Sequence, residues 1–454
     1  MTYSEHVRAV TALALPLAAS QLASFAVHMT DVIMMGWYGL DELAALVLGS
    51  GFWFITFIFL AGFAFAVMPL VAKAAGEGDT TMVRRSTRMA IWLSIIAAVV
   101  VYPLFGFSGR VLVALGQKEE LAALARPYLA VTGIEMLPAL VVAVFRSYFS
   151  ALERTRVVLV GTILAVALNF FLNYVFIFGN FGAPELGIVG AGIASLLVNI
   201  ALVAGFAVYA AWATPENDLF RNVLKPDWDM FKRVFKMGVP IGLTALAEVG
   251  LFNAAALMMG WISTVALAAH GVALQLSAIA FMLQIGLSQA GTIRVGNAYG
   301  RHDEDELRRS AVVVTVMSLV VAAMTFAVFL LYSKPLIGLF IAPDEPARDM
   351  VLATGAGFML FAALFQFSDG GQVTALSLLR GVQDTTVPMW YAGVSYWLIG
   401  LPAAYVAGFV MDFGGKGIWF GLLVGLSSAW VMMGLRFWLN KSRIGPKPAT
   451  SDAA

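Results

Sequence analysis

Met-Met-Gly-Trp at residues 34–37 returns unchanged at residues 258–261, and this recurrence decides the fold. The two copies lie within longer segments, 16–79 and 240–303, which align without a gap. A repeat of this length indicates that the chain consists of two homologous halves, each folding into the same kind of unit.

The two copies differ at the positions that carry a carboxylate. Asp31 in the first copy aligns with Ala255 in the second, whereas Glu248 in the second copy aligns with Ser24 in the first. Each half therefore has its own acidic residue inside an otherwise apolar segment. Acidic groups at depth in a duplicated membrane protein are typical of transporters that couple to a cation.

The composition places the chain in a membrane. Apolar residues make up 61% of the chain and charged residues 12%, which is more apolar surface than a soluble domain can bury. The absence of cysteine excludes disulfides and thiolate metal sites, and a net charge of +1 gives no support for a nucleic-acid partner. The first apolar segment is long enough to stay in the membrane as a span instead of being removed as a signal peptide.

Twelve segments have the length and hydropathy of membrane spans. We expect all of them to be helical, because lipid offers no hydrogen-bond partner to open backbone groups. We expect prolines inside these helices to bend them, with Pro16 as the bending element of the first. The expected spans are 9–37, 44–72, 88–106, 122–149, 156–178, 187–212, 232–261, 266–296, 309–331, 350–379, 387–410 and 415–438.

The even number of spans in each half predicts an all-α membrane protein of two parallel six-helix bundles, related by a pseudo-two-fold axis along the membrane normal. We predict an N-terminal lobe over 1–212, a cytoplasmic linker over 213–231, a C-terminal lobe over 232–440 and a disordered cytoplasmic tail over 441–454. Only six of the 28 Lys and Arg residues fall in the loops of the opposite side, which predicts that both termini are cytoplasmic.

Asp31 lies late in the first helix, where an ionised carboxylate is costly unless it is protonated, paired or wet. No Lys or Arg is expected at the middle of any span, so His28, one turn earlier, is its only nearby candidate partner. Asn169 and Asn173 share one face of the fifth helix and, with Ser195 in the sixth, offer oxygen ligands for a proton or for Na⁺. The alternatives are a wet Asp31 at the outer interface and asparagines that only form interhelical hydrogen bonds.

The second half has Glu248 near the middle of the seventh helix and Asp369 near the middle of the tenth. Neither is expected to have a basic partner at its depth, so the pair favours the binding of a proton, Na⁺ or a lipophilic organic cation. The alternative is a static hydrogen bond in which the two acids share one proton. Glu135 in the fourth helix is a minor candidate, which we expect to face the outer vestibule.

These features together resemble the multidrug and toxic compound extrusion (MATE) family, most closely its NorM-type branch. The resemblance extends over residues 8–440, and it is carried by the ordered set of motifs and not by any single one. The carriers are Pro16, Thr30-Asp31, Met34-Met35-Gly36, Leu-Asn-Phe-Phe-Leu-Asn at 168–173, Glu248, Asp369 and Leu-Arg-Gly-Val-Gln-Asp-Thr at 379–385.

The resemblance implies a V-shaped transporter whose two lobes alternate between inward and outward openings. It also implies that the acidic site of the family's N-lobe corresponds to Asp31 with the two asparagines, and its NorM-type C-lobe cation site to Glu248 and Asp369. The family often has a hydroxylated aromatic residue four positions before the second of these acids. Here that position is Phe365, which favours protons over Na⁺.

We therefore expect a multi-pass antiporter of a bacterial inner membrane, not an enzyme, that exchanges inward-moving H⁺ or Na⁺ for amphipathic organic cations such as drugs and dyes. We expect a monomer in membrane lipid, without a cofactor. One rival is a lipid-linked saccharide flippase, which requires a basic central cavity. The other is an integral-membrane transferase, which requires Asp-rich or His-containing metal motifs. Neither feature is apparent in the sequence.

Overall fold

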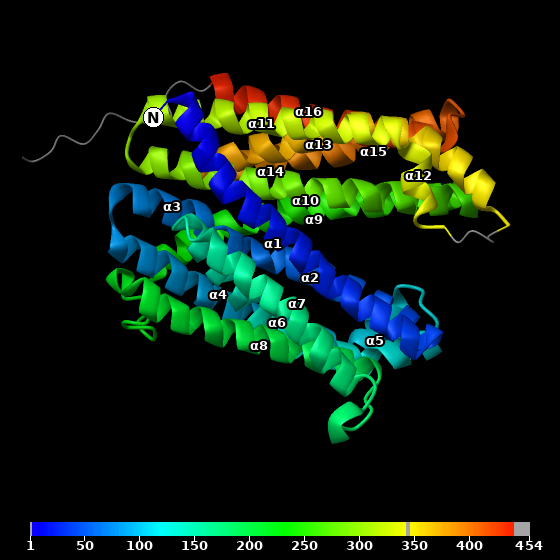
Figure 1. Ribbon diagram of the computed structural model, residues 1–454, viewed down its shortest axis with the longest axis horizontal. Helices are drawn as coiled ribbons and strands as arrows, with labels where there is room; N and C mark the ends of the chain where they lie inside the picture. The colour runs from blue at the N-terminus through cyan, green and yellow to red at the C-terminus, as the bar shows by residue number, and fades with distance from the viewer. Residues whose placement is uncertain (1, 342–345, 440–454) are drawn as a thin grey trace, which may run out of the picture. The chain divides into compact units, whose positions relative to one another are not determined.

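The computed structural model describes residues 2–341 and 346–439, and within them the chain is helical without a strand (Figure 1). Twelve helical segments of the described part are long and apolar enough to cross a membrane, so the expected all-α membrane architecture is confirmed. The tail predicted over 441–454 lies outside the described residues.

The elements of the first half are α1 (Tyr3–Tyr38), α2 (Leu40–Phe65), α3 (Val67–Glu77), α4 (Thr80–Gly106), α5 (Ser108–Ala114), α6 (Glu119–Ala151), α7 (Thr155–Phe176), η1 (Asn180–Gly182), α8 (Ile188–Ala213) and η2 (Pro215–Asn217). The elements of the second half are α9 (Trp228–Ile262), α10 (Thr264–Gly300), α11 (Glu304–Leu331), α12 (Ser333–Gly338), α13 (Arg348–Gly381), α14 (Thr386–Gly393), η3 (Val394–Gly400), α15 (Leu401–Tyr405), η4 (Val406–Val410) and α16 (Gly414–Leu439).

Two of the expected spans are interrupted instead of continuous. The second consists of α2 and α3, which meet at Ala66, and Pro69 lies in the first turn of α3, where a missing backbone N–H costs least. The eleventh is π-helical in η3 and η4, on either side of Pro402 in α15. Because proline donates no backbone hydrogen bond, a local change of helical pitch accommodates it. Pro16, in contrast, lies inside a continuous α1.

By contacts, the chain divides into two compact units. We call Ala19–Leu246 the N-unit, and Met1–Ala18 together with Ala247–Ala454 the C-unit. The boundaries fall inside α1 and α9, whereas the division expected from the sequence keeps each of these helices within one lobe. The amino-terminal part of each repeat's first helix thus belongs to the unit formed by the rest of the other repeat.

Close contacts between small residues explain this exchange. In the N-unit, Gly62 of α2 approaches Gly238 and Gly242 of α9 so closely that a methyl group at residue 62 would overlap the α9 backbone. In the C-unit, Gly286 of α10 approaches Ala18 of α1 in the same way. Gly62 aligns with Gly286 in the repeat, and Ala18 aligns with Gly242. The two halves therefore make the same helix contact twice, each time with the other half's first helix.

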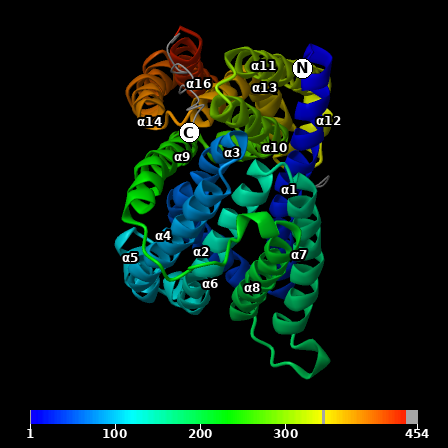
Figure 2. The same ribbon diagram turned by 90° about the vertical axis from the view of Figure 1, so that its left-hand side faces the viewer.

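Each unit is organised around one long buried helix. In the N-unit, α6 packs against α2, α4 and α8 (Figure 2). In the C-unit, α13 packs against α10, α11 and α16 (Figure 1). The central helices α6 and α13 carry Glu135 and Asp369, so each places an acidic side chain inside the packed part of its unit.

The linker between the two halves is held against α4 in the N-unit. Arg85 donates two hydrogen bonds to Asp227, at 2.5 and 3.1 Å, and Arg88 donates one to the carbonyl oxygen of Asn222 at 3.0 Å. Trp92 Nε1 donates to the carbonyl oxygen of Val223 at 2.8 Å. The hydrogen bonds from Arg85 hold the pKa of the Asp227 carboxyl below its ordinary value.

We expect Asp227→Asn to lower the free energy of unfolding by about 1 kcal/mol at neutral pH, the size typical of a partly exposed ion pair. Asparagine caps the first turn of α9 as well as aspartate does, so the substitution isolates the charge. Because folding lowers this pKa, the contribution is present above the unfolded-state value near 3.8 and is lost as the pH falls through the folded-state value.

Denaturant unfolding of the purified protein at neutral and at acidic pH measures this difference. Asp41→Asn is the matched control, because Asp41 is an exposed residue in the first turn of α2 and forms no ion pair among the described residues. Equal stability of the Asp227→Asn and Asp41→Asn variants at neutral pH would contradict the role of the Arg85 pair.

Candidate functional site

The structure brings Asp31 together with three polar side chains from two other helices of the N-unit. Asn169 and Asn173 of α7 donate from Nδ2 to Asp31 Oδ1, at 3.0 and 2.6 Å, and Ser195 Oγ of α8 donates to Asp31 Oδ2 at 3.4 Å. The two asparagines are fully buried, and they face the same point because they are four residues apart on one helix. Asp31 itself is partly buried.

This cluster continues to Glu135 of α6. Asn199 of α8 donates from Nδ2 to Glu135 Oε1 at 2.9 Å and also to the carbonyl oxygen of Ser195 at 3.1 Å. Glu135 is 6% exposed and lies close enough to Asp31 for the two charges to interact. Glu135, which we expected to face the outer vestibule, is therefore buried in the N-unit as a neighbour of Asp31. Sequence reasoning missed Asn199, although its spacing of four residues from Ser195 places both on one face of α8.

The hydrogen-bond pattern suits a site that exchanges one positive charge for another. All the partners recorded for Asp31 are neutral donors, which suits the ionised carboxylate. Asn173 Oδ1 is buried and accepts no hydrogen bond, so an acceptor is at hand for a protonated carboxyl group. Rotation of either amide would present its oxygen to a hard cation such as Na⁺.

The remaining N-terminal candidates do not join this cluster. His28 is exposed and has no hydrogen bond or ion pair with Asp31 in the described part of the chain. Pro16 lies in the segment of α1 that belongs to the C-unit, whereas Asp31 lies in the segment that belongs to the N-unit.

In the C-unit, Glu248 of α9 and Asp369 of α13 lie close enough for their charges to interact. Asp369 is 4% exposed, and its Oδ1 has no hydrogen-bond partner. Tyr396 of η3 interacts electrostatically with both acids, and its side chain is fully buried. The tyrosine comes from an interrupted helix, and its distance from either acid along the sequence gave no signal of the contact.

Neither Glu248 nor Asp369 forms an ion pair with a basic residue within the described residues, but Arg380 interacts electrostatically with Glu248. The sequence placed Arg380 in a loop, but α13 continues to Gly381 and keeps this arginine in its last turn. The long side chain of arginine can extend its charge several ångströms back along a helix.

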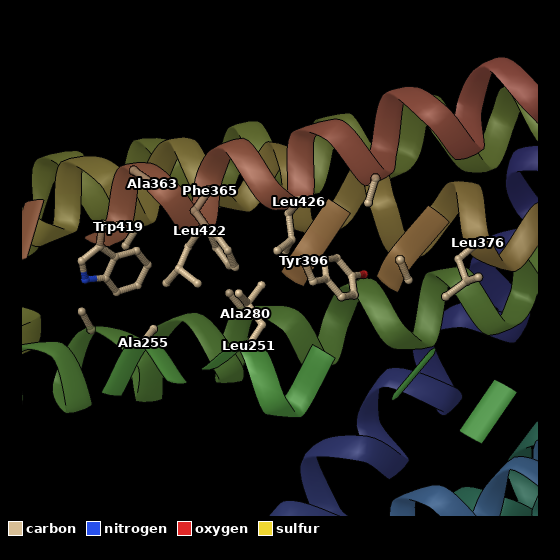
Figure 3. Close-up of a cluster of buried hydrophobic side chains, with 14 of the residues drawn as sticks. Leu251, Ala255, Ala280, Ala363, Phe365, Leu376, Tyr396, Trp419, Leu422 and Leu426 are labelled. Carbon is tan, nitrogen blue, oxygen red and sulfur yellow. The ribbon is translucent and has the colours of Figure 1, made fainter. Parts of the chain in front are cut away.

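Phe365, four residues before Asp369, packs in the apolar core of the C-unit. Its ring meets Trp419 of α16 edge-on, with ring centroids 5.8 Å apart (Figure 3). The ring centroid of Phe252 in α9 lies 6.0 Å from that of Phe365. The phenol of Tyr396 belongs to the same cluster, so a hydroxylated aromatic is present near the acids but comes from another helix (Figure 3).

A polar network supports α13 next to Asp369. Ser318 Oγ of α11 donates to Gln284 Oε1 of α10 at 2.8 Å and lies 3.2 Å from the carbonyl oxygen of Gly370. Gln284 Nε2 donates in return to the carbonyl oxygen of Ser318 at 3.1 Å. These hydrogen bonds hold the α13 backbone at Gly370, the residue after Asp369. The packing there is close, because a side chain at residue 370 would collide with Gln284.

Arg146 lies in α6, five residues before that helix ends at Ala151. Its guanidinium donates hydrogen bonds to Gln21 and Ser24 of α1, the helix that also carries Asp31.

The comparisons with known proteins agree with this architecture. The sequence profile of the family described as MatE matches residues 16–175 and 240–406, which are the two halves of the repeat. The chain belongs to the MATE family. MATE proteins are transporters and not enzymes.

Full-length relatives carry the NorM name. A "Probable multidrug resistance protein NorM" of Rhizobium meliloti is 42% identical over 99% of this chain and 97% of that protein. One of Agrobacterium fabrum is 40% identical over 97% of this chain and 96% of that protein. The solved structure of the eukaryotic MATE transporter AtDTX14 has a TM-score of 0.87 at 18% identity, covers 97% of both chains and so supports the fold.

Proposed function

We propose that this MATE protein is a multidrug efflux antiporter of a bacterial inner membrane, driven by inward movement of H⁺ or Na⁺. The observation that carries the proposal is Asp31, a carboxylate in a span whose recorded partners are all neutral. Such a group is costly unless it binds a positive charge, and a protein that can exchange the bound charge can use it for transport. The NorM-named relatives support drugs as the cargo.

The proposed mechanism is competition for the acidic sites. A coupling ion neutralises Asp31 in the N-unit or the Glu248–Asp369 pair in the C-unit, and an organic cation bound to the same charge then leaves. Transport requires that the two facing states differ in their affinity for ion and drug. Amphipathic cationic drugs and dyes suit this chemistry, and the protein is expected to work as a monomer with both termini in the cytoplasm.

Pro16 is the proposed bending element of α1. It lies two residues before Ala18, where α1 makes its close contact with Gly286, and Pro240 lies two residues before the equivalent Gly242 in α9. A proline removes one backbone hydrogen bond at this point of each exchanged helix. Bending there would change how the segment bearing Asp31 meets α7 and α8.

The rival flippase requires a basic central cavity, which Arg146 and Arg380 near the ends of α6 and α13 do not form by themselves. The near full-length similarity to proteins named for multidrug resistance also opposes it. A lipid-linked saccharide flipping assay on the reconstituted protein discriminates between the two functions.

Ethidium transport in vesicles tests the proposal. We expect vesicles that contain the protein to move ethidium against its gradient when either a pH gradient or a Na⁺ gradient is imposed, and to stop when a protonophore or equal Na⁺ removes that gradient. Asp31 binds a proton with a single carboxylate oxygen, whereas Na⁺ requires several oxygen ligands and the asparagines turn their Nδ2 atoms toward Asp31, so the pH gradient is the expected driver. Ethidium movement that responds to neither gradient would contradict cation coupling.

A further inference from the structure

The amino-terminal end of α4 and the linker enclose a pocket of about 610 Å³ in the N-unit. This volume lies within the roughly 300–1,000 Å³ of typical small-molecule sites. Four basic and two acidic side chains line the pocket, so positive charge exceeds negative charge by two. These side chains are Arg84, Arg85, Arg88, Lys225, Asp227 and Asp229. An excess of positive charge at a concave site favours the binding of an anion.

The carboxylates near the pocket leave two of its arginines without a hydrogen-bonded counter-charge. Asp227 accepts both hydrogen bonds of Arg85, so these two residues compensate each other. Arg88 lies 3.8 Å from Asp227. Arg84 lies 3.9 Å from Asp218, and neither distance allows a hydrogen bond. Arg88 is 7% exposed, and its Nε has no hydrogen-bond partner within the described residues. A buried donor of this kind has an unmet demand for an acceptor.

The internal repeat shows that this excess of positive charge belongs to the N-unit alone. Continued past its first 64 positions, the gapless alignment places the Arg-Arg-Ser at 84–86 on the Arg-Arg-Ser at 308–310. In the C-unit, α11 begins with three carboxylates at 304–306, directly before its two arginines. The N-unit has Thr-Thr-Met at 80–82 in their place, and it adds Arg88 where the C-unit has a valine. The same helix end therefore supplies anions to its arginines in one half and leaves them to another source in the other.

Apolar and aromatic side chains place this pocket at the surface of the membrane. Trp92, one turn after Arg88 on α4, donates to the carbonyl oxygen of Val223 in the linker. Tryptophan is enriched where membrane and water meet. Farther along, α4 exposes the apolar side chains of residues 96, 99 and 100, as expected of its lipid-facing part. On the other side of the pocket, Leu224 and Trp228 are largely exposed. A lipid that lies along α4 would thus present its headgroup to the pocket.

We propose that this pocket binds the phosphate of an anionic phospholipid, with Arg84, Arg88 and Lys225 as its cationic ligands. Guanidinium groups match the geometry of a phosphate with paired N–H donors, and the ammonium of Lys225 adds a point charge. In the predicted orientation the lipid belongs to the cytoplasmic leaflet, whose anionic lipids attract basic segments near the membrane. The bound headgroup bridges α4 and the linker. The inference does not depend on which cargo the protein carries.

Native mass spectrometry of the purified full-length protein, titrated in a neutral detergent with phosphatidylglycerol or phosphatidylcholine, tests this site. Both lipids contain a phosphate, but the ammonium of phosphatidylcholine cancels its charge. We expect the first phosphatidylglycerol to bind roughly tenfold more tightly, the factor typical of a hydrogen bond between charged groups. We expect the double variant Arg84→Gln, Lys225→Gln to reduce this preference to about twofold or less. Neither side chain supplies the hydrogen bonds that hold the linker to α4.

Arg308→Gln is the matched control, because Arg308 occupies the equivalent position in the C-unit and already pairs with Glu304 at 2.9 Å. This variant should keep the wild-type preference. Equal affinity of the wild-type protein for the two lipids overturns the inference, even if the double variant does not fold. A preference that survives in a folded double variant overturns it as well. Inorganic phosphate and glycerol 3-phosphate are the soluble competitors, and displacement of phosphatidylglycerol by either at millimolar concentration would assign the pocket to a soluble phosphate and overturn the assignment to a lipid.

Discussion

Asp31→Asn is expected to reduce ethidium efflux and drug resistance to the level of cells without the protein. Asparagine has nearly the same shape as aspartate, so Asn169, Asn173 and Ser195 still surround it. It cannot take up and release a proton or balance the charge of a cation, although its amide oxygen can still accept the hydrogen bonds of the two asparagines. Growth in ethidium and vesicle efflux under a pH gradient measure the loss.

The matched control for Asp31→Asn is Asp41→Asn, the same chemical change at an exposed residue in the first turn of α2. This variant should retain wild-type efflux, and both variants should reach the membrane in equal amounts. Because the substitution removes an ionised group from a span, the unfolding temperature of Asp31→Asn should not fall below that of the wild type. Coupled efflux that persists in Asp31→Asn would remove this residue from the coupling mechanism.

The sequence was sufficient to predict the twelve spans and the partners of Asp31. Spans are set by local hydropathy, and the pairing of Asn169 with Asn173 follows from their spacing on one helix. That both amides and Ser195 turn toward Asp31 is a tertiary fact. It was nevertheless accessible, because few polar side chains occur in these spans and each must find another.

Arg380 lies one residue beyond the expected span 350–379, whereas α13 continues to Gly381 and includes it. A helix end is determined by capping and by tertiary contacts, which a hydropathy window does not detect. The same limitation hid Tyr396, which reaches the acids from the π-helical segment beside Pro402. The exchange of α1 and α9 between the units depends on contacts of Gly62 and Gly286 with the other repeat. A repeat alignment gives the equivalence of these glycines but not their partners.

Glu248→Gln and Asp369→Asn form the second strong prediction, and we expect each to abolish high-affinity ethidium binding and most of the efflux. The two carboxylates interact with each other, and Arg380 partly compensates Glu248, so together they have room for about one further positive charge. Asp369→Asn leaves Glu248 matched by Arg380 and removes the attraction for a cation. Glu248→Gln leaves Arg380 without the carboxylate with which it interacts, so an uncompensated positive charge stays in the C-unit and opposes the binding of a cation.

This difference between the two acids predicts different responses to a second substitution. Arg380→Gln in the Glu248→Gln background removes the uncompensated positive charge, so ethidium binding should recover in part, whereas the same change added to Asp369→Asn should not restore transport. Asp349→Asn is the control, since Asp349 is an exposed residue in the first turn of the same helix α13. Fluorescence titration with ethidium gives the affinities, and size-exclusion chromatography shows whether each variant is folded.

Equal behaviour of the two double variants would mean that Arg380 does not act through Glu248. Wild-type affinity in both single variants would place the drug site elsewhere in the protein. The pair is informative because a carboxylate that acts only as a static hydrogen-bond acceptor loses little when an amide of the same shape replaces it, whereas one that binds a cation loses its function.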